Sequence, residues 1–127
     1  MTLNSYLSVV TLRVNGLNDP IKRHRVSDWI KEQDPFAICC LQETHLRPKD
    51  TSSLKMRGWR TIYHSNGPQR KAGVSLIIPD KLKFIPKIVV RDEEGHYIIL
   101  KGSIYQEDLT IMNIYTLMWE PPSISIN

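Results

Sequence analysis

The order of apolar and polar positions along the first forty residues predicts a strand, a helix and a second strand. Residues 6–14 are mostly apolar or β-branched, and they end at the turn dipeptide Asn15-Gly16. Asp19-Pro20 is a candidate helix start with proline at the first helical position, and Asp34-Pro35 predicts the end of that helix. The apolar run over residues 36–41 is typical of a strand buried on both faces. We therefore predict a βαβ unit with two parallel strands.

Beyond this unit the pattern changes to short strands separated by clusters of turn residues. The predicted strands cover residues 59–65, 73–79, 87–91, 97–104 and 109–115. Their regular spacing predicts a meander that continues the same sheet. Residues 117–127 contain two prolines and no periodicity, so we expect a disordered tail there. A sheet needs cover on both faces, and this pattern offers one long helix, so we expect the chain to be part of a domain.

Composition places the chain among soluble globular proteins. Of its 127 residues, 41% are hydrophobic and 24% are charged, which excludes collagen-like, disulfide-rich and charge-driven disordered classes. No apolar run approaches the roughly 20 residues of a membrane span, and no signal peptide is recognisable, so we expect no membrane partner. The two cysteines, Cys39 and Cys40, are adjacent and fall in a predicted buried strand. We interpret them as packing residues in a reduced, intracellular environment.

The net charge of +4 is unevenly distributed, with +6 over residues 1–71 and −2 over residues 72–127. A basic half indicates a polyanionic partner, of which nucleic acid is the commonest, although an ordinary solvated surface carries similar charge. We infer no obligate protein partner. The candidate phosphate contacts are Lys22, Arg23 and Arg25 on the exposed helix face and Arg70 and Lys71 in a predicted loop.

Polar residues follow both strands of the predicted βαβ unit. Arg13, Asn15 and Gly16 end the first strand, and Gln42-Glu43-Thr44-His45 directly follows the second. In open α/β sheets, ligands collect beyond the carboxyl ends of such strands. A carboxylate in this position, here Glu43, can hold Mg²⁺ through oxygen, although a surface glutamate capping a loop would look the same.

Three segments carry a family resemblance: Leu12-Arg13-Val14-Asn15-Gly16-Leu17, Leu41-Gln42-Glu43-Thr44-His45 and Met112-Asn113-Ile114-Tyr115. Together they resemble the exonuclease III and apurinic-endonuclease branch of the endonuclease/exonuclease/phosphatase superfamily. The resemblance is closest to the endonuclease domain of mammalian long interspersed retrotransposons. It implies an α+β fold, the N-terminal half of a four-layered, DNase I-like sandwich over residues 1–116, with residues 117–127 as a divergent tail.

The resemblance also implies an activity, which is Mg²⁺-dependent hydrolysis of DNA phosphodiesters, with the nucleus favoured over the cytoplasm. It makes Glu43 the magnesium ligand and Tyr115 the active-site phenol that orients a phosphate oxygen. Asn113 would support the site from the same strand face as Tyr115. Asn15 would contribute an amide near the metal, although a simple turn residue is expected before glycine.

Arg13 departs from the family pattern, which places asparagine at this position. A guanidinium is permanently positive and accepts no hydrogen bond, so it would repel a metal ion beside Glu43. The side chain could instead swing away and grip a phosphate. We expect weakened catalysis on this ground.

The family's Gly-Asp-Phe-Asn and Ser-Asp-His segments do not occur in the sequence, and Thr116-Leu117-Met118 replaces its Ala-Pro-Asn. The missing segments supply the proton-handling aspartate, further metal ligands and the Asp–His pair. We therefore expect this truncated copy to be inactive alone. The alternatives are a non-catalytic nucleic-acid-binding fragment and an inositol-phosphate or sphingolipid phosphodiesterase of the same superfamily. The second is disfavoured by residues 22–25 and 94–98, which look like the retrotransposon branch.

Overall fold

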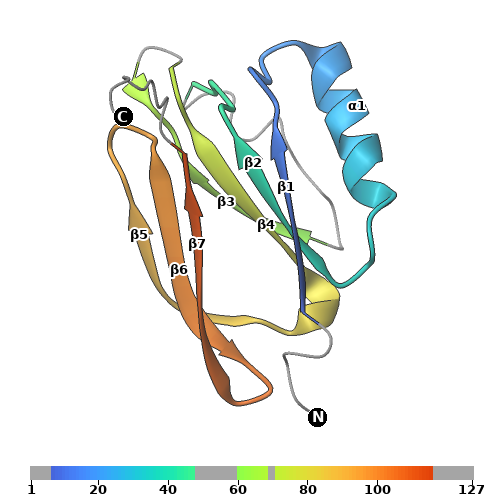
Figure 1. Ribbon diagram of the computed structural model, residues 1–127, viewed down its shortest axis with the longest axis vertical. Coiled ribbons are helices and arrows are strands. Elements are labelled where there is room, and N and C mark those ends of the chain that lie inside the picture. Colours follow the sequence, from blue (N-terminus) through green and yellow to red (C-terminus); the bar gives the residue numbers. More distant parts are fainter. Residues whose placement is uncertain (1–6, 48–59, 69–70, 116–127) are drawn as a thin grey trace, which may run out of the picture.

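The structure, a computed structural model, describes residues 7–47, 60–68 and 71–115, which form two stacked β-sheets and a helical layer (Figure 1). In chain order the elements are β1 (Ser8–Arg13), α1 (Pro20–Lys31), β2 (Ala37–Gln42), β3 (Arg60–Ser65), β4 (Val74–Pro79), the 3-10 helix η4 (Asp80–Leu82), β5 (Ile85–Arg91), β6 (Tyr97–Ile104) and β7 (Glu107–Ile114). One sheet has the strand order β1-β2-β4-β3 and is called the mixed sheet. The other has the order β5-β6-β7 and is called the antiparallel sheet.

The predicted βαβ unit is present. Strands β1 and β2 pair in parallel, from Ser8 opposite Ala37 to Arg13 opposite Gln42. Helix α1 starts where the sequence predicts, because the Asp19 side chain accepts a hydrogen bond from the Ile21 amide at 2.9 Å. The helix ends at Lys31, and Asp34 forms the turn into β2, because its carbonyl oxygen accepts from the Ala37 amide at 2.9 Å and its carboxylate from the Phe36 amide at 2.8 Å.

Two hydrophobic cores lie on opposite faces of the mixed sheet. Strand β2 is central and contributes to both, since successive side chains of a strand point to opposite faces. Toward α1, the core contains Cys39, Leu41, Ile77, Val26 and Ile30. Toward the antiparallel sheet, it contains Ile38, Cys40, Leu76, Ile98, Leu100 and Ile111. The mixed sheet is therefore the middle of three layers.

The prediction that the meander continues the first sheet is confirmed for β3 and β4, which pair in the mixed sheet, and was wrong for β5, β6 and β7. Within the described part of the chain, β5, β6 and β7 pair only with one another and form the second sheet. The cause lies after Pro79, where η4 and the left-handed residue Lys83 (φ 55°) redirect the chain before β5. The antiparallel sheet thus covers the face of the mixed sheet that was expected to lack a layer.

Several apolar side chains remain exposed, on the edge strand β1 and on the outer face of β7. Val9 of β1 is 53% exposed, and Met112 and Ile114 of β7 are 56% and 55% exposed. The expectation that the chain is only part of a domain agrees with these uncovered residues. The predicted tail over residues 117–127 lies outside the described residues.

Cys39 and Cys40 are both buried, as packing residues should be. Burial raises the pKa of the Cys40 thiol to about 11, so this thiol stays protonated at neutral pH. None of the helices within the described ranges is both long and apolar enough to cross a bilayer.

His64 on β3 predicts a pH dependence of stability. Its Nδ1 lies 2.8 Å from Ser75 Oγ, and burial, helped by the positive charge of Arg91, lowers its pKa from 6.5 to about 4. Between pH 6.5 and about pH 4, His64 takes up a proton in the unfolded chain but not in the folded chain, so acidification favours unfolding. Between pH 7 and pH 4, we expect the native chain to lose about 3 kcal/mol more stability than His64→Gln.

Urea unfolding curves of both proteins at pH 7, 5 and 4 measure this difference. Equal losses in the two proteins would contradict the assignment of the pH dependence to His64.

Candidate functional site

The candidate site lies at the edge of the sheets where β1, β2 and β7 end. Parallel pairing places the carboxyl ends of β1 and β2 side by side, and β7 points its carboxyl end the same way (Figure 1). Arg13 is the last residue of β1, Glu43 directly follows β2, and Tyr115 directly follows β7. The topology therefore brings together three residues that are far apart in the sequence.

Arg13 and Glu43 form an ion pair in which Arg13 Nε donates a hydrogen bond to Glu43 Oε2. On the other carboxylate oxygen, Glu43 Oε1 lies 3.7 Å from His45 Nε2. Burial acts to raise the pKa of the Glu43 carboxyl, but the hydrogen bond and the charge of Arg13 outweigh it and hold this pKa below its ordinary value. Glu43 is therefore ionised and held by a permanent cation.

Arg13 also contacts Tyr115, with its guanidinium carbon 5.3 Å from the centre of the phenol ring. This is within the range of a cation–π interaction. Partial burial and the nearby negative charge of Glu43 raise the pKa of the Tyr115 phenol, so the hydroxyl is neutral at physiological pH. Arg13 thus contacts both the carboxylate and the aromatic ring of the candidate site.

The residues present do not fit a bound Mg²⁺ ion. Within the described ranges no group of three or more His, Cys, Asp or Glu side chains could hold a metal, so a Mg²⁺ ion at this edge would depend on Glu43. The carboxylate that the resemblance names as the ligand, Glu43, is engaged by a guanidinium that cannot lose its proton. Two like unit charges 4 Å apart repel by about 4 kcal/mol at an effective dielectric of 20, and a divalent ion beside Arg13 would be repelled more.

Asn113 lies beneath this cluster and joins the two sheets. Its side chain is 2% exposed, and its Nδ2 donates to the carbonyl oxygens of Leu41 at 3.0 Å and Ser75 at 2.8 Å. Its Oδ1 accepts a hydrogen bond of 3.2 Å from Gln42 Nε2. These bonds fix the end of β7 against β2 and β4, so they position Tyr115, two residues later, relative to the loop after β2.

Asn15 occupies the turn after β1 in a left-handed conformation (φ 54°), and it is exposed. Its carbonyl oxygen accepts a hydrogen bond from Lys22 Nζ at 3.0 Å. The next residue, Gly16, donates its amide to the Glu43 carbonyl oxygen at 2.7 Å. The turn around Asn15 therefore holds the backbone of Glu43, which is itself left-handed (φ 57°).

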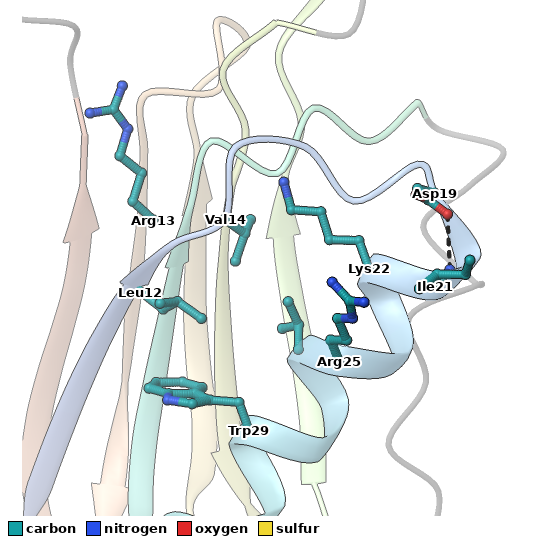
Figure 2. Close-up of a pocket in the computed structure, with 9 residues that line it drawn as sticks. Leu12, Arg13, Val14, Asp19, Ile21, Lys22, Arg25 and Trp29 are labelled. Atoms are coloured by element: carbon teal, nitrogen blue, oxygen red, sulfur yellow. Dashed lines mark hydrogen bonds between the residues drawn. The ribbon is translucent and has the colours of Figure 1, made fainter.

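The predicted phosphate contacts divide into separate places. Lys22 and Arg25 line a groove between β1 and α1, which we call the β1–α1 groove. Arg13 lines one end of it, with its side chain pointing away from α1 (Figure 2). Arg23 instead donates to the Leu17 carbonyl oxygen at 2.9 Å. Lys71 is exposed in the loop before β4, and Arg70 lies outside the described residues.

Sequence reasoning missed two features of the site. Gln42 was named only as part of the polar segment after the second strand and was given no role, although its side chain also donates to the Ile114 carbonyl oxygen at 3.2 Å. The groove was missed as well, because the apolar pattern of a strand and a helix gives no signal for a groove between them. A polar residue that ends a buried strand was the available signal for Gln42.

Comparison with known proteins agrees with this architecture. Residues 1–123 match the family model described as the Endonuclease/Exonuclease/phosphatase family. The catalytic domain of APE2 from Xenopus laevis has a similar fold, with a TM-score of 0.62 and 17% sequence identity. The match covers 91% of this chain and 46% of the APE2 chain, so this chain spans less than half the length of that structure. The predicted α+β, DNase I-like partial fold is confirmed. Since the family match extends over nearly the whole sequence, the chain belongs to the endonuclease/exonuclease/phosphatase family.

Proposed function

We propose that this chain is the N-terminal half of a DNA endonuclease domain, and that by itself it binds DNA without cleaving it. Family membership indicates nuclease or phosphodiesterase chemistry for the complete domain. The observation that carries the proposal is the ion pair between Arg13 and Glu43, because it engages the carboxylate expected to bind the metal.

Hydrolysis of a phosphodiester requires a positioned base and a group that stabilises the developing charge. The described residues offer no free carboxylate beside Tyr115 and no cluster that would hold a metal. What they offer is a guanidinium and a phenol side by side, and both can donate hydrogen bonds to a phosphate oxygen. The edge is therefore suited to binding a phosphate rather than to breaking its ester bond.

DNA is the proposed polyanion because the basic residues Lys22 and Arg25 lie along the groove that ends at Arg13. For the complete domain, we propose Mg²⁺-dependent strand nicking, a relationship to retrotransposon endonucleases and a nuclear location. They rest on the sequence segments around Arg13, Glu43 and Tyr115.

Two measurements on the purified chain test the proposal. In a supercoiled-plasmid assay with Mg²⁺, we expect no nicking above the level seen with Glu43→Ala. In fluorescence anisotropy with a labelled 20-base-pair duplex, we expect binding that EDTA does not change. If three cations each neutralise one phosphate, affinity should fall about 40-fold between 50 and 200 mM salt.

Metal-dependent nicking that disappears in Glu43→Ala would refute the non-cleaving half of the proposal. Binding that vanishes with EDTA, or that is indifferent to salt, would refute metal-independent binding through phosphate contacts.

A further inference from the structure

The β1–α1 groove has an apolar, partly aromatic floor. Leu12 and Val14 of the β1 region and Trp29 of α1 line it, and its volume is about 390 Å³. Trp29 is half-buried and packs beside Leu12 at the lower end of the groove (Figure 2). This volume is within the roughly 300–1,000 Å³ of small-molecule sites, and β1 is the edge strand of its sheet, so one side of the groove is open.

The rim of the groove is positively charged. Lys22 and Arg25 project from the same side of α1 toward β1, above the floor (Figure 2). Asp19 is the one acidic residue among the described residues that line the groove, and its carboxylate accepts the amide hydrogen of Ile21. The groove therefore combines a flat apolar surface with cations whose charge no lining carboxylate neutralises by an ion pair.

We infer that this groove holds an unpaired nucleotide of a DNA strand, with its base against Trp29 and its phosphates at Lys22 and Arg25. The inference rests on the proposed function and adds to it a preference for single-stranded DNA. A nucleobase is flat and stacks on an aromatic ring, and the adjoining phosphate requires cations, which are the two properties that the groove offers.

The position of the groove favours a nucleotide within a strand over an isolated amphipathic anion. Arg13 lines one end of the groove and is also the residue that contacts Glu43 and Tyr115. One strand could therefore place a phosphate at Arg13 and the neighbouring nucleotide in the groove. An isolated anion would use the groove alone and would gain nothing from Arg13.

Tryptophan fluorescence tests the contact between the base and Trp29. Replacing the other two tryptophans, as Trp59→Phe/Trp119→Phe, leaves Trp29 as the reporter. The probes are a twelve-residue oligothymidylate and an abasic polymer with the same phosphates and no bases. We expect the oligothymidylate to quench the fluorescence and to bind about tenfold more tightly than the abasic polymer.

Variants in the full chain separate stacking from charge. Trp29→Leu should abolish the preference for bases and leave binding of the abasic polymer within twofold. Lys22→Gln/Arg25→Gln should weaken binding of both polymers and lower the salt slope by about 1.4, since each cation contributes about 0.7 on a single strand. The control Lys31→Gln/Lys101→Gln removes two exposed charges away from the groove and should change either affinity less than twofold.

Equal binding of the two polymers without quenching would overturn the groove assignment and leave the proposed function standing. Failure of both polymers to bind, beside a 20-base-pair duplex that still binds, would overturn the groove assignment alone, and failure of the duplex as well would overturn the proposed function too. If Trp29→Leu does not fold, as judged by circular dichroism, the reporter protein with Trp29 retained decides between these outcomes.

Discussion

Arg13→Asn is expected to let Glu43 bind a divalent cation. The substitution removes the guanidinium that donates to Glu43 and replaces it with an amide, whose oxygen is a suitable ligand for a hard cation. The repulsion of about 4 kcal/mol per unit charge at close range is removed at the same time. A tenfold change in a dissociation constant corresponds to about 1.4 kcal/mol, which is less than half of that repulsion. We therefore expect the dissociation constant for Mn²⁺ to fall at least about tenfold.

Water-proton relaxation in titrations with Mn²⁺ measures this constant without reference to catalysis. The double variant Arg13→Asn/Glu43→Gln should lose the gain, because its remaining side chain at position 43 is neutral. Lys101→Gln removes one positive charge from an exposed position of β6 and controls for the change in net charge. Native protein that binds Mn²⁺ as tightly as Arg13→Asn would show that the guanidinium does not exclude the metal.

The local elements of the fold follow from short-range signals in the sequence. The cap formed by Asp19 and Pro20 fixes the start of α1, and the apolar run before Gln42 fixes β2, so both were predictable within one or two residues. The division into two sheets was not predictable in this way. Strands β5 to β7 would show the same alternation in either sheet, and the choice depends on the redirection of the chain at η4.

The positions of the site residues were predictable, but their interactions were not. Parallel strands necessarily bring Arg13 and Glu43 to one edge of the sheet. Sequence reasoning left open whether Arg13 would repel a metal ion there or swing toward a phosphate. In the folded chain Arg13 is paired with Glu43, which lies 30 positions away in the sequence. No short-range pattern in the sequence shows this contact. The role of Asn113 could not be predicted from the sequence, since it depends on contacts with residues 38 and 72 positions away.

Asn113→Leu is expected to lower the free energy of unfolding by about 2–3 kcal/mol. The asparagine side chain is buried and makes three hydrogen bonds between the sheets, to Leu41, Ser75 and Gln42. Leucine has a similar size but leaves these buried polar groups without the partner, and each such loss costs about 1–3 kcal/mol before relaxation. Urea unfolding monitored by circular dichroism measures the change.

Thr110→Val is the matched control for this substitution. Thr110 lies on the same strand but is exposed, so exchanging its hydroxyl for a methyl group should change stability by less than about 0.5 kcal/mol. A large loss in Asn113→Leu beside a small one in Thr110→Val would locate the stabilisation in the buried hydrogen bonds rather than in β7 as a whole. Equal effects would contradict this, and Asn113 would then have no special part in holding β7 and Tyr115 against the mixed sheet.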